Sequence, residues 1–182
     1  MPDIGVCIEP FYPGASFEDK LAQISKLGFT SYEFWFHDKT FTGSSMIDEM
    51  KDFSQIARLN KKYGLRTNDF VLNHPDGAIV AALIDRRDTQ KIVDALPDMI
   101  AKAKTIGCKK FISGSGNVIA GMQEEEAYDA MVDSLKAIGK ICAESDMEII
   151  LEPFNTRVDH PDYFLDNPQK AVDVLKAVGN DH

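Results

Sequence analysis

The sequence predicts an α/β fold in which a parallel sheet is covered by helices. Short apolar runs alternate with longer amphipathic segments along the 182 residues, a pattern typical of a parallel sheet with helical cover. Glycines that end the amphipathic segments recur at roughly one or two multiples of 36–43 residues, the length of one strand–helix unit. About five such units fit into the chain. Because a closed barrel needs eight units and roughly 250 residues, the prediction is a partial (β/α)8 barrel.

The first two helices are predicted from signals at their ends. Ser16 is expected to cap the first helix, because a serine oxygen accepts hydrogen bonds from the free N–H groups of a first turn. Gly28 is expected to end this helix in the left-handed conformation. The second helix is predicted over Met50–Tyr63 and ends at Gly64.

The third helix carries a conflicting signal. Asp88 is expected to cap it and Gly107 to end it. Pro97 lies inside the segment and lacks the N–H that a helix interior uses, so we expect it to kink the helix or to split it in two.

The last two helices and the strands complete the alternation. The fourth helix is predicted over Glu124–Ala143, and the fifth begins at an Asn167 cap with Pro168 in the first position and ends at Gly179. The strands are predicted over the apolar runs Asp3–Glu9, Thr30–Phe36, Leu65–Leu72, Lys109–Ser113 and Met147–Leu151.

Composition limits the class of protein. The formal net charge of −9 disfavours nucleic acid as a partner, because phosphate binding needs a basic surface. No apolar run has the roughly 18 residues of a membrane span, and the three cysteines are expected to be reduced core thiols. We therefore expect a single cytoplasmic domain over 1–182.

Polar residues follow the predicted strands. His37 comes after the second strand, Asn73 and His74 come after the third, and Glu152 comes directly after the fifth. In a parallel α/β fold, these loops share the face where ligands bind. Glu152 is interpreted either as a metal ligand or acid/base, or as a loop cap paired with Arg157. Each histidine is either a ligand or an ordinary loop residue.

The second strand has two different faces. Alternation places Glu33, Trp35 and His37 on one side and Tyr32, Phe34 and Phe36 on the other. Glu33 is interpreted either as a polar group of a barrel interior or as half of a partly buried ion pair. Arg157 has the geometry to hold a substrate carboxylate with two hydrogen bonds, or it forms a surface ion pair.

The segment Ile149–Leu165 resembles the hydroxypyruvate isomerase family within the xylose-isomerase-like TIM barrels. That family carries Glu-Pro-(apolar)-Asn-(Thr/Ser)-Arg, then an Asp and a Pro-Gly-Tyr/Phe-Phe-Leu segment. The chain matches this pattern except at Asp162, where the family has glycine. Weaker matches are Leu27–Glu33 and Leu72–Gly77.

The resemblance implies a metal-dependent isomerase that interconverts a hydroxy-keto acid and its aldehyde isomer through an enediolate. It implies Mg²⁺ or Mn²⁺ as the cofactor and Glu152 as both a metal ligand and one half of a glutamate acid/base pair. Substrate binding is assigned to the following residues: Glu33, His37, Asn73, His74, Arg157 and His160.

The resemblance also implies that the other metal ligands come from the sixth to eighth strands, which this sequence does not reach. We therefore expect a C-terminally truncated barrel whose open edges are covered by a homo-oligomer or a complementing chain. Two alternatives stay open: a ketose 3-epimerase with the same metal geometry, and a non-catalytic remnant that serves as a binding or interaction module.

Overall fold

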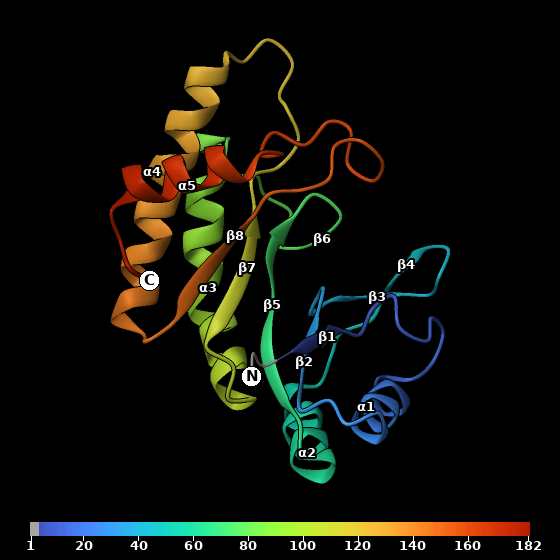
Figure 1. Ribbon diagram of the computed structural model, residues 1–182. Helices are drawn as coiled ribbons and strands as arrows, with labels where there is room; N and C mark the ends of the chain where they lie inside the picture. The colour runs from blue at the N-terminus through green and yellow to red at the C-terminus, as the bar shows by residue number, and fades with distance from the viewer. Residues whose placement is uncertain (1–3) are drawn as a thin grey trace. The chain divides into compact units, whose positions relative to one another are not determined.

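The computed structural model describes residues 4–182 (Figure 1). These residues form eight strands: β1 (Gly5–Cys7), β2 (Ser31–Phe34), β3 (Lys39–Phe41), β4 (Met46–Asp48), β5 (Arg66–His74), β6 (Gly77–Ala78), β7 (Lys110–Gly114) and β8 (Glu148–Glu152). Five helices alternate with them: α1 (Phe17–Lys26), α2 (Phe53–Tyr63), α3 (Arg86–Thr105), α4 (Glu124–Glu144) and α5 (Pro168–Val178). All five predicted strands and all five predicted helices are confirmed within these residues, whereas Asp3, at the start of the first predicted strand, lies outside them.

The strand order of the main sheet is β1-β2-β5-β7-β8, with β6 added to β5. The β1–β2 and β2–β5 pairs are parallel, and a helix connects each strand of this order to the next, as parallel strands require. β1 and β8 stand at the two ends of the order, so the described strands do not close a barrel. The predicted α/β class and partial barrel are confirmed.

The described chain forms two compact units. The first contains residues up to Val71 together with Ile100–Lys110, and the second contains Leu72–Met99 together with Phe111–His182. β5 and α3 contribute residues to both units. Whether the chain behaves as one domain stays a prediction.

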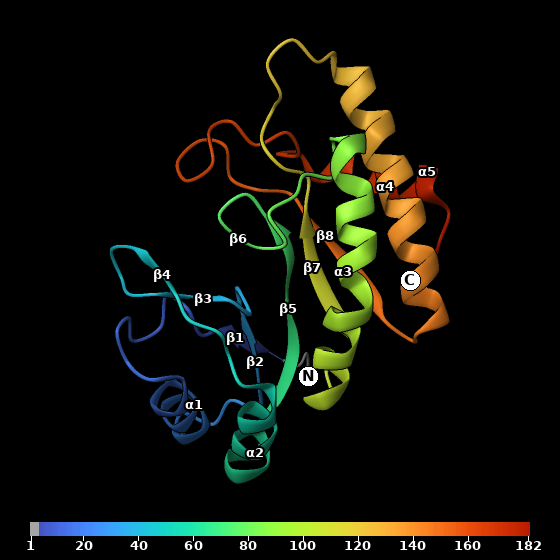
Figure 2. The same cartoon turned by 180° about the vertical axis from the view of Figure 1, so that it is seen from behind.

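The core of the first unit depends on the alternation in β2. Tyr32, Phe34 and Phe36 are buried, whereas Glu33 and Trp35 are only half-buried, as predicted. Phe34 stacks on Phe70 of the neighbouring strand, with ring centroids 5.0 Å apart and planes 4° apart. This aromatic layer packs against the first turns of α1 and α2, which lie side by side in Figures 1 and 2.

The helix ends follow local chemistry. The Ser16 hydroxyl accepts a hydrogen bond from Asp19 N at the start of α1, as predicted. α2 begins three residues later than predicted, because Asp52 supplies the cap oxygen for Ser54 N and Gln55 N. Gly64 ends α2 with φ +64°, a conformation that favours glycine.

The prediction for the start of α3 is wrong. The helix begins at Arg86, and Asp85 accepts a hydrogen bond from Arg87 N. Asp88 lies in the first turn and accepts from Ala82 N instead. The structure also contradicts a split at Pro97, because α3 is one helix. Proline removes a single N–H, so the flanking turns keep their hydrogen bonds.

The second unit packs α5 against α4, as Figures 1 and 2 show. Lys170 pairs with Glu124 at 2.6 Å between the first turns of these helices. Asn167 caps α5 through Gln169 N, and Gly179 ends it with φ +65°, both as predicted.

The three cysteines are free thiols. Cys108 and Cys142 are buried and Cys7 is half-buried. Burial raises the pKa of the Cys7 and Cys108 thiols to about 12 and that of Cys142 to about 11, so all three are protonated at neutral pH. The predicted place in the core is confirmed for Cys108 and Cys142, whereas Cys7 lies at its margin beside Glu33.

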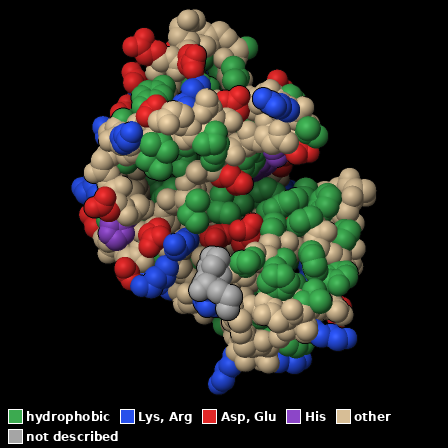
Figure 3. All heavy atoms as spheres, in the orientation of Figure 1, with side chains coloured by type: hydrophobic (Ala, Val, Ile, Leu, Met, Phe, Trp, Pro, Cys, Tyr) green, Lys and Arg blue, Asp and Glu red, His purple; other side chains and the backbone are tan. Residues whose placement is uncertain are grey.

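Two surface properties concern possible partners. Among residues 4–182, no helix has the length and apolar character that a membrane crossing requires. On the face in Figure 3, Lys and Arg side chains occur in small separate groups among acidic and apolar ones.

Candidate active site

The candidate site of the second unit lies where strands end. His74 is the last residue of β5, Gly114 is the last of β7, and Glu152 is the last of β8. The strand therefore ends one residue later than predicted and includes Glu152, which is exposed. The loop after β8 then runs from Pro153 to Asn167 before α5 begins.

This loop brings rings from different parts of the sequence together. Phe154 stacks on Tyr163, with centroids 4.2 Å apart and planes 14° apart. The ring centroid of His160 lies 4.5 Å from that of Phe154. The ring centroid of His74 lies 5.8 Å from that of Phe154 and 6.1 Å from that of His160. We call these four residues, His74, Phe154, His160 and Tyr163, the ring cluster. It places two of the predicted substrate-binding residues next to each other.

His74 is held as a neutral hydrogen-bond donor. Its Nδ1 accepts a hydrogen bond from Asp76 N at 3.0 Å, so the ring proton of the neutral form is on Nε2. Burial lowers the pKa of His74, and the nearby His160 adds to this effect, while the Asp76 carboxylate opposes it. A neutral imidazole with an Nε2–H can polarise a carbonyl or hydroxyl oxygen.

Tyr163 connects the ring cluster to the ends of β7 and β8. Its side chain is 4% exposed and lies over Gly114, where an added Cβ would be 1.7 Å from Tyr163 Oη. Burial, with a smaller contribution from the Glu152 charge, raises the pKa of Tyr163 to about 12. Glu152 therefore lies close enough to the ring cluster for its charge to act there.

Asn73 is fully buried, and its side-chain amide forms hydrogen bonds that connect β5 to neighbouring segments. Its Nδ2 donates to Ala81 O at 3.0 Å and to Gly114 O at 3.1 Å. Its Oδ1 accepts from Ser113 Oγ at 2.5 Å. Both amide hydrogens are thus used by backbone carbonyls, and Asn73 positions the ends of β5 and β7. Its predicted contact with substrate stays a prediction.

The remaining predicted residues lie in two places. Arg157 is exposed in the loop after β8, where its backbone N donates to Asn155 Oδ1 at 3.1 Å. Glu33 and His37 belong to the first unit and are half-buried. Glu33 pairs in register with Cys7 across β1 and β2, and its charge helps to raise the pKa of that thiol, after burial.

A resident metal ion needs several donor side chains close together. Across residues 4–182, no three His, Cys, Asp or Glu side chains come close enough together to hold a metal ion. Glu152 alone supplies one carboxylate, so these residues do not fit a resident metal by themselves.

Sequence reasoning did not identify Phe154 and Tyr163 as site residues. The available signal was the presence of aromatic residues in the loop that follows Glu152. Their place in the ring cluster is evident only from the stacking distance.

Known proteins support the fold and the resemblance. A relative from Homo sapiens named "Putative hydroxypyruvate isomerase" is 32% identical over 90 residues, which are 47% of this chain and 32% of the relative. A relative of the same name from Danio rerio is 28% identical over 137 residues, 70% of this chain and 48% of the relative. The chain thus spans less than half the length of these relatives.

Solved structures agree on the fold. An AP endonuclease of family 2 from Brucella melitensis gives a TM-score of 0.78 at 22% identity, over 99% of this chain and 66% of that protein. The IOLI protein, solved with a bound zinc atom, gives 0.73 at 16% identity, over 98% of this chain and 60% of that protein. The family description "Xylose isomerase-like TIM barrel" matches residues 21–182. This chain therefore belongs to the xylose isomerase-like TIM barrel family.

Proposed function

We propose that this chain provides part of the active site of a sugar-type isomerase, with hydroxypyruvate and tartronate semialdehyde as the substrate pair. The observation that carries the proposal is the position of Glu152 at the end of β8, directly before the loop that forms the ring cluster with His74. The similarity to relatives named as hydroxypyruvate isomerases supports the choice of reaction.

The described residues suit the first half of such a reaction. Glu152 is an exposed carboxylate that can take the proton from the carbon beside the substrate carbonyl. The Nε2–H of His74 can donate to the oxygen that gains charge as the enediolate forms. Returning the proton to the neighbouring carbon gives the aldehyde isomer, and the resemblance assigns this step to a second carboxylate.

Arg157 favours an acidic substrate over a neutral sugar. Its guanidinium is exposed in the loop after β8, and arginine binds carboxylates with paired hydrogen bonds. A ketose 3-epimerase would have no use for that group. We therefore place the hydroxy-keto acid first and the epimerase second.

A divalent metal belongs to the proposal only together with a further source of ligands. Mg²⁺ and Mn²⁺ favour oxygen ligands, and the described residues gather no set of three side chains for them. We assign no step to a metal here. A second copy or a complementing chain, pairing with the end strands β1 or β8, would have to supply the missing carboxylates.

The experiment follows proton abstraction directly. Hydroxypyruvate is incubated in D₂O with the chain and Mn²⁺ or Mg²⁺, and deuterium entry at the carbon beside the carbonyl is followed by NMR. Glu152→Gln should remove the protein-dependent exchange. Glu148→Gln is the matched control, because it changes the same residue type at the other end of β8 and should leave the exchange unchanged.

Sedimentation of the same samples reports the oligomeric state. Exchange above the buffer background that survives in Glu152→Gln would contradict the assigned role of this carboxylate. An assembled protein that gives no exchange with either metal would contradict the isomerase itself and leave a non-catalytic binding module as the better description.

A further inference from the structure

A pocket with a volume of about 350 Å³ lies entirely within the first unit. This volume falls within the range of roughly 300–1,000 Å³ that small-molecule sites occupy. Residues before and within α1, the β3–β4 hairpin and the first turns of α2 form its walls. The candidate active site uses none of these lining residues.

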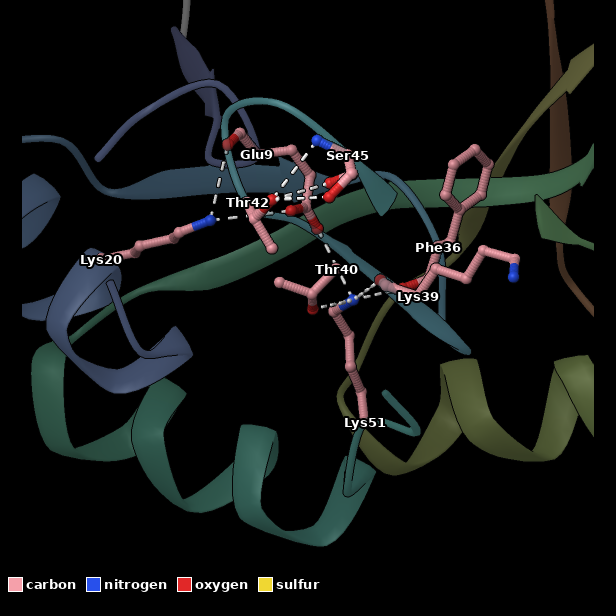
Figure 4. Close-up of polar contacts among 8 residues, drawn as sticks. All are labelled: Glu9, Lys20, Phe36, Lys39, Thr40, Thr42, Ser45 and Lys51. Carbon is pink, nitrogen blue, oxygen red and sulfur yellow. Dashed lines mark hydrogen bonds and ion pairs between the residues drawn. The ribbon is translucent and has the colours of Figure 1, made fainter. Parts of the chain in front are cut away.

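Three buried charges line this pocket, as Figure 4 shows. Glu9 is 1% exposed and Lys20 is 2% exposed, and the Lys51 side chain is 5% exposed. Lys20 Nζ lies 3.6 Å from Glu9 Oε2, and Lys51 Nζ lies 3.6 Å from Glu9 Oε1. One carboxylate therefore lies between two ammonium groups.

The ammonium groups of Lys51 and Lys20 differ in the number of hydrogen bonds that they donate. Lys51 Nζ donates to Phe36 O at 2.5 Å, to Lys39 O and to Thr40 Oγ1 at 3.3 Å. These acceptors use all three hydrogens of an ammonium group and anchor the start of the hairpin that covers the pocket. The role of Lys51 is thus explained by the fold.

Lys20 and Glu9 are not explained in this way. Among the described residues, the Lys20 ammonium group makes one hydrogen bond, a long one of 3.4 Å to Glu9 O. Glu9 Oε1 has no hydrogen-bond partner among them, and its nearest cation is Lys51. Each of these groups thus has an opposite charge at 3.6 Å but few or no hydrogen bonds, and a buried charged group is stabilised when such bonds are made.

The charges of the lining residues indicate what can satisfy these groups. Glu9, Glu49 and Asp52 against Lys20 and Lys51 give a formal charge of −1, which disfavours an anionic ligand. A hydroxyl group can accept from an ammonium and donate to a carboxylate at the same time.

The other lining groups suit the same class of ligand. Thr40, Thr42 and Gln55 add further donors and acceptors, and Phe17 and Leu59 provide apolar surface for C–H groups. We propose that this pocket binds a neutral polyol or sugar, with one ligand hydroxyl bridging Lys20 and Glu9.

The test uses xylitol as the probe and D-xylonate as its anionic counterpart. Binding to the full chain is followed by NMR shifts of the pocket amides. Xylitol should bind more tightly than D-xylonate, and Lys20→Met should weaken xylitol binding at least tenfold. Lys26→Met, at the exposed end of the same helix, is the matched control and should bind like the unchanged chain.

Gln55→Ala provides a second variant, because Gln55 lines the pocket from an exposed position of α2 and alanine suits a helix. It should weaken xylitol binding without loss of folding. The proposal is overturned if xylitol does not bind the unchanged chain, if D-xylonate binds equally well, or if Gln55→Ala binds as the unchanged chain does. These readouts are binding shifts, so they are independent of isomerase activity.

Discussion

Replacing Asn73 with alanine tests whether this buried amide positions the ends of β5 and β7. The change removes three hydrogen bonds and leaves two backbone carbonyls, of Ala81 and Gly114, and the Ser113 hydroxyl without this partner. Each buried polar group that loses its partner costs about 1–3 kcal/mol. The hydroxyl can rotate, so we expect a total loss of about 3–5 kcal/mol, a large part of the roughly 5–15 kcal/mol that stabilises a typical domain.

Urea denaturation measures this loss. The unchanged chain, Asn73→Ala, Ser113→Ala and the double variant form a mutant cycle. Ser113→Ala removes only the 2.5 Å hydrogen bond to Asn73 Oδ1. It should therefore lower the free energy of unfolding by about 1–3 kcal/mol. The double variant should cost less than the sum of the two single variants, because both lose the same bond.

Two results would refute the reasoning. A loss below about 1 kcal/mol for Asn73→Ala would mean that the carbonyls find other partners. Normal stability together with weakened hydroxypyruvate binding would instead make Asn73 a substrate-binding residue, as the resemblance to the hydroxypyruvate isomerase family implies.

Two further predictions concern the ring cluster. Gly114→Ala should lower the free energy of unfolding by about 1–3 kcal/mol, because its Cβ would lie 1.7 Å from Tyr163 Oη; thermal unfolding should show partial recovery in the double variant with Tyr163→Phe, and no recovery would contradict the clash. The pKa of His74, lowered by burial, should give an NMR titration midpoint below 6.5. Because the unfolded chain then binds the proton more readily, this residue's contribution to stability is present above pH 6.5 and is lost as the pH falls through the folded pKa. His74→Phe should remove that part of the pH dependence, and a midpoint at or above 6.5 would contradict the burial argument.

The sequence was sufficient where local chemistry decides the structure. Ser16 and Asn167 cap helices through their own side chains, and Gly64 and Gly179 end helices in a conformation that favours glycine. These signals act within a few residues, so one segment contains the whole cause.

Local signals failed where two residues compete for one role. Asp85 and Asp88 both suit a helix start, and the preceding loop decides between them, because Asp88 bonds to Ala82 N. The β3–β4 hairpin was not predicted, since its strands of three residues each are too short to show alternation.

The site was predictable in its chemistry but not in its geometry. Glu152, His74 and His160 were predicted because the loops that follow parallel strands share one face. Adjacent residues of a strand point to opposite sides, and this separates Asn73, bonded to two carbonyls, from His74 in the ring cluster. Which of the two neighbours would reach the cluster depends on strand register, which the sequence did not specify.

Lys20 shows how one residue can reveal a site that a motif search overlooks. Phe17, Lys20, Leu21 and Ile24 have the i, i+3, i+4, i+7 spacing of a buried helix stripe, so a lysine there needs a buried partner. With Lys20→Met, Glu9 keeps Lys51 as its counter-ion, and one buried cation is removed. We therefore expect a free energy of unfolding within about 1 kcal/mol of the unchanged chain or above it, measured by urea denaturation, while xylitol binding is lost. A loss above about 3 kcal/mol, the cost of breaking a required buried pair, would show that Lys20 is kept for folding and that the pocket needs no ligand to account for it.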